Sequence, residues 1–215
     1  AIRWPARIPA GRRVKELTSL IDLTPTILEA AGVARPETDP MAGKSLLGAG
    51  GAPRRPVISG RERHTSARKD NLGYPSRAIR TADYLYIRNL KPDRWPMGDP
   101  RCFDGKGELL PMHSGYYDID RCPTLTMLIE RRDDPAIAPF FQRAVAHRPL
   151  EELFLVEKDP GCLKNLADDP AFAAKKSLLA ADLMKALSET DDPRLGRTPD
   201  VWETYPRYMV IRKFP

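Results

Sequence analysis

The sequence predicts an α+β fold, in which a small antiparallel sheet carries helices on one face. Three observations point to this class: short β-patterned stretches come early, one more follows a long connection, and a clear helix comes after it. Of the 215 residues, 41% are hydrophobic, which is enough for a folded core and suits one domain or one and a half.

The N-terminal stretch predicts one strand and one helix. Residues 1–4 have the pattern of a short strand, which Pro5 ends. "SLIDLTPTILEAAG" then predicts a helix, because Asp22 or Thr24 can cap its start and Gly32 can close it.

A Gly/Pro-rich connection follows this helix and predicts a domain boundary, with a first part at 1–50 and a second at 51–215. The chain begins with "AIRWPARIP", which has no initiator methionine and resembles an element already under way. We therefore expect a fragment of a longer protein, whose own N-terminus and any targeting signal are absent.

The second part begins with strands. "PVISG" is typical of a short buried strand, and "RAIRTADYLYIRNL" predicts a hairpin that turns at Ala82 and Asp83. Tyr84 and Tyr86 share one face of its second strand and are expected to pack under the terminal helix. "EELFLV", at 151–156, predicts another core strand.

Residues 91–123 form a long Pro/Gly-rich and aromatic connection, and a loop of this length is usually functional or covers something. Helical stretches near 125–131 and 136–147 follow it. "DDPAFAAKKSLLAADLMKALSET" predicts the clearest helix, capped by Asp169. Its apolar face consists of Phe172, Leu179, Leu183 and Leu187.

Two patterns suggest metal or disulfide chemistry. "DDP" occurs three times, but an acid before Pro is also the expected chemistry of a helix start, and we favour that interpretation. The three cysteines, Cys102, Cys122 and Cys162, form no Cys-x-x-Cys pair, so a zinc knuckle is not predicted. A disulfide between Cys102 and Cys122 stays open.

The net charge of +6 favours anionic partners in general, whether nucleic acid, sulfated or phosphorylated sugars, or acidic lipid. The stretch "SGRERHTSARKDNLGYPSRAIRT", at 59–81, gathers six Arg and Lys residues around one histidine. No zinc finger, RNP-like strand or helix-turn-helix pattern is present, and the apolar runs are too short to cross a bilayer. We therefore expect neither a nucleic acid nor a membrane as partner.

Several stretches together resemble the C-terminal part of a sulfatase. "IRWPARIPAGRRVKELTSLIDLTPTILEAAGV" is similar to the passage after that family's last metal-ligand motif, and "AGKSLL" to its G-x-S-L-L loop. "ELFLVEKDPGCLKNLADDPAF" is similar to its signature E-L-Y-D-L-x-x-D-P-x-E-x-x-N-L-A-x-D-P. The histidine before "YPSRAIRTADYLYIRNLKPDRWP" resembles most the sulfamidase (heparan N-sulfatase) branch.

The resemblance implies the tail end of an alkaline-phosphatase-like α/β catalytic domain at 1–50. It implies a C-terminal subdomain with about four antiparallel strands at 51–215. In that family the larger domain carries a formylglycine, a calcium site and the catalytic groups. None of those motifs occurs in this sequence. Calcium and formylglycine are therefore implied for a missing N-terminal catalytic half, and we expect this chain alone to be inactive.

The resemblance also makes the basic stretch a wall of a pocket for a sulfated sugar, preferably an N-sulfoglucosamine of the heparan type. His64 is expected to bind a sugar hydroxyl or a sulfate oxygen, and Glu62 to accept from a hydroxyl. Arg68, Arg77 and Arg80 are candidates for a substrate carboxylate or a second sulfate, because the Arg fork matches oxyanions. The simpler alternatives are a solvated histidine and ordinary ion pairs. We assign no catalytic residue and no metal ligand in this chain.

Two other functions stay open: a polyanion-binding module, whose affinity would fall steeply with salt, and a purely structural or interaction domain. If the chain is a fragment, residues 1–31 should expose apolar surface that normally packs on the missing sheet. We therefore expect homo-oligomers of the isolated chain.

Overall fold

The computed structural model describes residues 1–47 and 56–215. Two compact units are present: Ala1–Val57 with Arg80–Ala82, and Ile58–Ile79 with Asp83–Pro215. The predicted boundary between residues 50 and 51 lies outside the described residues.

The first unit contains one helix. The 3-10 turn η1 (Leu20–Asp22) runs into α1 (Leu23–Ala31), which Gly32 ends in the left-handed conformation, as predicted. The carboxylate of Asp22 accepts hydrogen bonds from the amides of Ser19 and Lys44 at 3.0 and 2.8 Å, so it ties two loops to the helix start.

The predicted strand at 1–4 is wrong. Residues 1–4 are irregular. The amides of Arg7 and Ile8 donate hydrogen bonds to the carbonyl of Trp4 and so form a turn. Pro5 has no amide hydrogen for a sheet ladder, which favours this turn over a strand. Several apolar side chains of the unit are exposed, as expected for residues 1–31: Ile2, Val14, Leu20, Ile21, Leu23 and Ile27.

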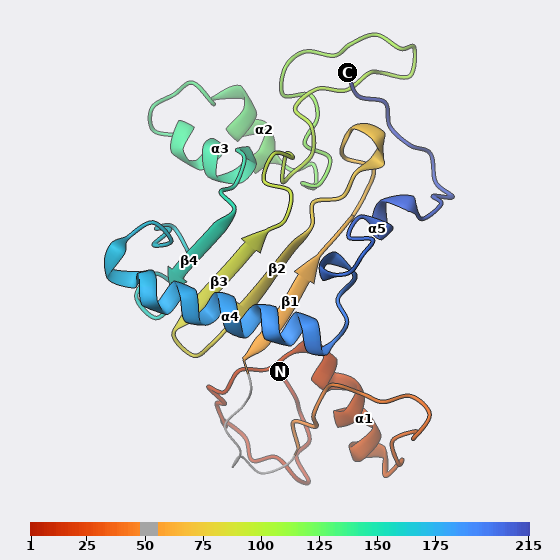
Figure 1. Ribbon diagram of the computed structural model, residues 1–215, viewed down its shortest axis with the longest axis vertical. Coiled ribbons are helices and arrows are strands. Elements are labelled where there is room, and N and C mark those ends of the chain that lie inside the picture. Colours follow the sequence, from red (N-terminus) through yellow and green to blue (C-terminus); the bar gives the residue numbers. More distant parts are fainter. Residues whose placement is uncertain (48–55) are drawn as a thin grey trace. The chain divides into compact units, whose positions relative to one another are not determined.

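The second unit is built on a four-stranded antiparallel sheet (Figure 1). Its strands are β1 (Val57–Arg61), β2 (Ser76–Arg80), β3 (Tyr84–Asn89) and β4 (Glu151–Leu155), and they lie side by side in chain order. β3 pairs antiparallel with β4, with Tyr86 opposite Leu153. The predicted sheet and hairpin are thus confirmed.

The long helix α4 (Ala173–Glu189) crosses one face of the sheet (Figure 1). The 3-10 turn η3 (Pro170–Phe172) precedes it, and the carboxylate of Asp169 caps that turn by accepting from the amide of Ala171 at 3.0 Å. Helix and sheet enclose the main core, which contains Ile79, Tyr86, Leu153, Leu166, Ala167, Leu179, Leu183 and Leu187. Tyr86 is 0% exposed and Tyr84 packs against the same core, so both tyrosines lie where the sequence predicted.

A second, smaller core lies around the long connection between β3 and β4. The helix α2 (Pro123–Glu130) begins two residues before the predicted stretch, and α3 (Ala138–Val145) is shorter than predicted. Tyr116 from the connection packs against Phe141 of α3, and its hydroxyl lies 2.8 Å from Nδ1 of His113. Cys102 and Cys122 are free thiols, so no disulfide joins them. Within the described ranges, no helix has the length and hydropathy needed to cross a membrane.

The chain after α4 contains η4 (Pro193–Leu195) and α5 (Val201–Thr204), and Glu203 joins this region to Gly73 and Arg94. Its carboxylate accepts from Arg94 at 2.7 Å, from the amide of Gly73 at 3.0 Å and from Arg194 at 3.2 Å. Burial alone would raise the pKa of Glu203, but these hydrogen bonds outweigh burial and hold the pKa below its ordinary value.

Truncating Leu183 to Ala should lower the free energy of unfolding by about 2–5 kcal/mol, because it leaves a cavity in the main core. Leu178→Ala is the matched control on the same helix, since that side chain is 53% exposed and should cost at most about 0.5 kcal/mol. Urea denaturation of both variants measures the difference. Equal midpoints would contradict the core assignment.

The depressed pKa of Glu203 predicts an acid-sensitive contribution to stability. The ionised carboxylate stabilises the fold at neutral pH. This contribution should begin to fall as the pH drops below about 5, where a free glutamate takes up its proton, and should be gone only below the lower pKa of the folded state. Glu203→Gln should therefore be less stable than the parent chain at pH 7, with a smaller further loss at pH 4. Urea midpoints at both pH values test this. The control Glu189→Gln changes an exposed residue of α4 and should keep the full pH dependence of the parent chain.

Candidate functional site

Three of the five predicted site residues, Glu62, His64 and Arg68, lie in the loop from Arg61 to Pro75, here called the His64 loop. It joins β1 to β2 and forms the yellow-orange turn beyond the ends of these strands in Figure 1. It includes the 3-10 turn η2 (Lys69–Asn71), where Asp70 and Asn71 have φ angles of 54° and 57°. Backbone in this left-handed region is uncommon for residues other than Gly and depends on surrounding contacts to hold it.

His64 is one of the exposed residues of this loop, with Lys69 and Asp70, and it lies next to a buried carboxylate. Its side chain is 71% exposed, while the side chain of Asp118 is 0% exposed. Nδ1 of His64 is 3.3 Å from Oδ1 of Asp118, close enough for electrostatic attraction but not aligned as a hydrogen bond. This contact directs one ring nitrogen inward and leaves Nε2 for solvent or a ligand.

Asp118 also holds two arginines of the same loop. Nη2 of Arg68 and Nη2 of Arg61 lie 2.6 and 2.8 Å from its Oδ2. Both guanidinium groups lie over the ring of Tyr74, at 5.6 and 5.7 Å from its centroid. Burial raises the pKa of Tyr74 to about 12. Two arginines and a histidine therefore meet one carboxylate at a single point.

Arg68 lies below the surface of this cluster. Its side chain is only 2% exposed, and it donates to the carbonyls of Trp95 and Pro96 at 2.6 and 2.7 Å. Burial lowers the pKa of Arg68, although Asp118 opposes that effect, and an arginine keeps its proton under ordinary conditions. Its role in the observed geometry is to compensate the charge of Asp118 and to fix the loop on the 95–96 segment.

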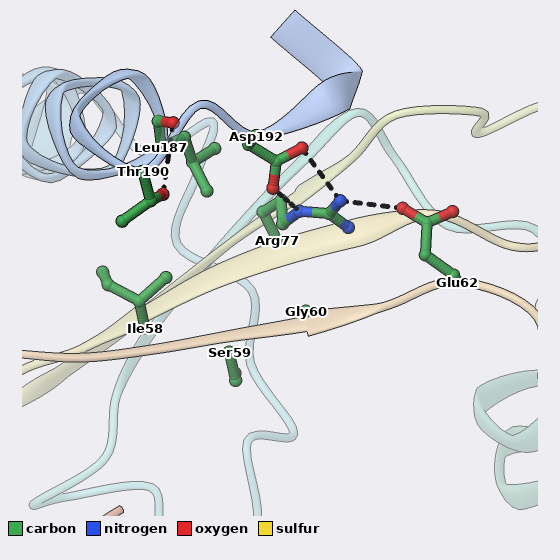
Figure 2. A pocket seen from close by; sticks show the side chains of 8 residues that line it. All are labelled: Ile58, Ser59, Gly60, Glu62, Arg77, Leu187, Thr190 and Asp192. Carbon is green, nitrogen blue, oxygen red and sulfur yellow. Dashed lines mark hydrogen bonds and ion pairs between the residues drawn. The ribbon is translucent and has the colours of Figure 1, made fainter. Parts of the chain in front are cut away.

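Glu62 and Arg77 meet in a second group (Figure 2). Arg77 donates through Nε and Nη2 to the two oxygens of Asp192 at 2.6 and 3.0 Å, and through Nη2 to Glu62 at 2.8 Å. Its Nη1 donates to the carbonyls of Arg61 and Ser76, so the guanidinium has partners in every direction. Burial would lower the pKa of Arg77, but the two carboxylates raise it overall.

A cavity of about 310 Å³ opens beside this second group, and Figure 2 shows its lining. Ile58, Leu187 and Thr190 complete its wall. Gly60 gives Arg77 room, because an added Cβ would lie 3.2 Å from the Cδ atom of Arg77. The polar atoms of Arg77 and Asp192 are already paired, so the cavity offers a ligand few open hydrogen-bonding positions.

Arg80 belongs to the first unit, and its guanidinium donates to the carbonyls of Thr81 and Ala82. The five predicted residues therefore fall into three sets: His64 with Arg68 through Asp118, Glu62 with Arg77, and Arg80 in the other unit. Sequence reasoning missed Asp118, Asp192 and Arg194. Each lies far along the chain from its partner, and only the length and aromatic content of the 91–123 connection pointed to the first of them.

The calcium and formylglycine implied by the resemblance do not fit the residues present. Among residues 1–47 and 56–215, no group of three or more His, Cys, Asp or Glu stands where it could hold a metal ion. Cys102 is buried with Sγ 3.3 Å from the hydroxyl of Tyr117, Cys122 is exposed and Cys162 half-buried. No step of a reaction is therefore assigned to a metal or a modified cysteine in this chain.

Comparisons with known proteins identify relatives of one kind. The chain is 28% identical over 199 residues to an ulvan-active sulfatase of Formosa agariphila, covering 89% of this chain and 28% of that protein. It is also 28% identical over 193 residues to the human N-sulphoglucosamine sulphohydrolase, covering 85% of this chain and 34% of that protein. No protein-family model matches.

A solved structure of a protein in complex with its substrate D-glucosamine-2-N,6-O-disulfate has the same fold, with a TM-score of 0.50 at 18% identity. The match covers 93% of this chain and 29% of that one. The chain thus spans about a third of the length of the proteins it matches. Its curated relatives include sulfatases, and its sheet and helices have the fold of the matching part of the solved complex.

Proposed function

We propose that this chain is the C-terminal portion of a sulfatase-family hydrolase that acts on sulfated sugars, and that its His64 loop closes one side of the substrate pocket. The relatives support the reaction class. The exposed His64 beside the buried Asp118 is the observation that carries the local part of the proposal, because it presents an oriented imidazole above two fixed cations.

In this proposal His64 is the direct contact with the sugar. Its Nε2 donates to a sulfate oxygen or exchanges a hydrogen bond with a hydroxyl, while Nδ1 faces Asp118. Arg61, with 32% of its side chain exposed, adds positive charge at the same place. A sulfated ligand is thus attracted by charge and oriented by one polar atom.

The other predicted residues have different proposed roles. Arg68 fixes Asp118, and Glu62 with Arg77 holds the base of the loop, since their polar atoms contact protein groups. Arg80 stays a predicted ligand for an anionic group of the substrate. The chain therefore contributes binding and orientation, and cleavage of the sulfur bond belongs to a catalytic part that carries calcium and formylglycine.

A sulfated glucosamine is the proposed substrate class. The human relative is named for N-sulphoglucosamine, and the substrate bound in the solved complex carries a 2-N-sulfate. The ulvan-active relative is equally similar in identity, so an ulvan-type sulfated sugar is the competing substrate in the test below.

The geometry gives less support to a polyanion-binding module. Such a surface relies on many unpaired cations along one face. Here Arg61, Arg68, Arg77, Arg94 and Arg194 are all in ion pairs with carboxylates.

The 215-residue chain should bind D-glucosamine-2-N,6-O-disulfate weakly, in the millimolar range expected for one wall of a pocket. His64→Ala should weaken this binding about tenfold or more, because it removes the exposed imidazole that Asp118 orients. Chemical-shift titration by NMR measures both affinities, with a desulfated glucosamine and a sulfated ulvan disaccharide as competing ligands.

Lys185→Ala is the matched control, because it removes one exposed cation on α4 and should leave the affinity unchanged. Unchanged affinity in His64→Ala, or equal affinity for the desulfated sugar, would contradict the proposed contact. Binding that depends on salt alone and not on the sugar would favour the polyanion module instead.

The chain alone should show no sulfatase or sulfamidase turnover with calcium present, because no cluster of its described residues could hold the metal. Release of inorganic sulfate from sulfated glucosamine measures this. Turnover that follows the pure chain through purification would overturn the assignment of cleavage to another part.

A further inference from the structure

The chain after α4 runs alongside the His64 loop, and contacts with that loop recur along its length. Here residues 192–214 are called the C-terminal segment, which is the dark blue part of Figure 1. In that view it leaves the end of α4, passes β1 and ends beyond the strands, on the side of the loop.

The first contact fixes the start of the loop. Arg194 has a side chain that is only 2% exposed, and its Nε and Nη2 both donate to the carboxylate of Glu62. Its Nη1 donates back to the segment itself, to the carbonyl of Pro199 at 2.8 Å and to Asp200 at 2.7 Å. Asp192 at the same end binds Arg77, which also holds Glu62.

The second contact fixes the end of the loop. Oε2 of Glu203 accepts from the amide of Gly73, and Arg94 completes the contact by donating to the carbonyl of Gly73 at 3.0 Å. Nη1 of Arg207 then donates to the side-chain oxygen of Asn71 at 3.2 Å. Asn71 is one of the two residues of the His64 loop with left-handed backbone, so this contact supports a conformation that costs energy.

The third contact fixes the part of the loop next to His64. The amide of Arg212 donates to Oγ of Ser66 at 2.9 Å, and its guanidinium donates to the carbonyl of Ser66 at 3.0 Å and to Oγ1 of Thr65 at 3.3 Å. The same guanidinium lies 4.3 Å from the ring centroid of Tyr117. Tyr117 directly precedes Asp118, so Arg212 touches both segments that orient the histidine.

The end of the segment is held by packing. Phe214 is buried and lies edge-on to Tyr117, and the amide of Phe103 donates to the carbonyl of Lys213 at 3.0 Å. Between these anchors the stretch 208–211 points outward, with Tyr208 and Val210 exposed by 94% and 91%. The segment therefore holds the loop through separate anchors and not through continuous burial.

We propose that the C-terminal segment is a strap that positions the His64 loop, with Arg212 as its positioning residue beside the histidine. Without the strap, the loop keeps the ion pairs of Arg61 and Arg68 with Asp118 and internal bonds such as the amide of Ala67 to the carbonyl of Thr65. The side chains of Thr65 and Ser66, next to His64, are hydrogen-bonded by the strap. The consequence for a sugar ligand rests on the proposed function, whereas the order of the loop does not.

The alternative is that the loop is rigid by itself and the segment only rests on it. Amide hydrogen exchange of the 215-residue chain, followed by mass spectrometry, separates the two. With Arg212→Ala, peptides covering 62–73 should exchange about five- to tenfold faster, because two side-chain hydrogen bonds and a stacking contact are lost and the loop opens more often. Peptides covering 179–187 in the main core should not change.

Val210→Ser is the matched control, because it alters an exposed residue of the same segment and should leave exchange of 62–73 unchanged. If Arg212→Ala also accelerates exchange in the core, Ser66→Ala decides, since it removes only the hydroxyl that accepts from the amide of Arg212. The result is read from whichever of these two variants leaves exchange in the core unchanged. If peptides covering 62–73 exchange at the parent rate in that variant, the strap proposal is overturned.

Titration of Arg212→Ala with D-glucosamine-2-N,6-O-disulfate tests the consequence for binding. Weaker binding, together with faster loop exchange, is the expected result. Faster exchange with unaltered sugar binding would leave the strap standing and count against His64 as the sugar contact, so the two proposals fail separately.

Discussion

The buried carboxylate of Asp118 is the constraint on which the arrangement of the site depends. A carboxylate with no exposed surface costs several kcal/mol of desolvation unless cations compensate it. Arg68 and Arg61 supply that charge, and His64 is drawn to the remaining oxygen. Because all three side chains belong to one loop, compensating Asp118 also fixes the conformation of that loop and decides which of its side chains faces solvent.

The same need for compensation explains why a chain of net charge +6 does not present a uniformly basic face at this site. Arg77, Arg94 and Arg194 are each matched by carboxylates of the C-terminal segment or of the loop. Pairs of this kind break at a high cost when one partner is removed, so they favour one geometry over others. The arginines around the loop therefore serve mainly to fasten it, while His64 and part of Arg61 face outward.

The similarity to sulfatases agrees with the proposal that this chain contributes binding and that another part contributes cleavage. The matched proteins are about three times as long as this chain, and the described residues hold no metal cluster. A small sheet with one covering helix is a rigid base for a loop, and residues that bind ligands are often on loops held by such a base. The identities to the ulvan-active and the human relatives are the same, so the binding test decides between their two classes of sugar.

The sequence by itself determined the elements. Alternation in "RAIRTADYLYIRNL" predicted the hairpin, and the spacing of Leu179, Leu183 and Leu187 predicted the buried face of α4. Asp169 before Pro170 marked the turn that leads into α4, because these signals are local. The same reasoning failed at residues 1–4. Their apolar side chains suggested a strand, but no strand among the described residues pairs with them.

Only the tertiary structure decided the site. Asp118, Asp192, Arg194 and Arg212 lie 50 to 146 residues from the loop and sheet groups they contact, and no periodicity of the sequence encodes contacts at that separation. The sequence contains a histidine among arginines. The tertiary structure determines which of these side chains are buried with carboxylates and which face solvent.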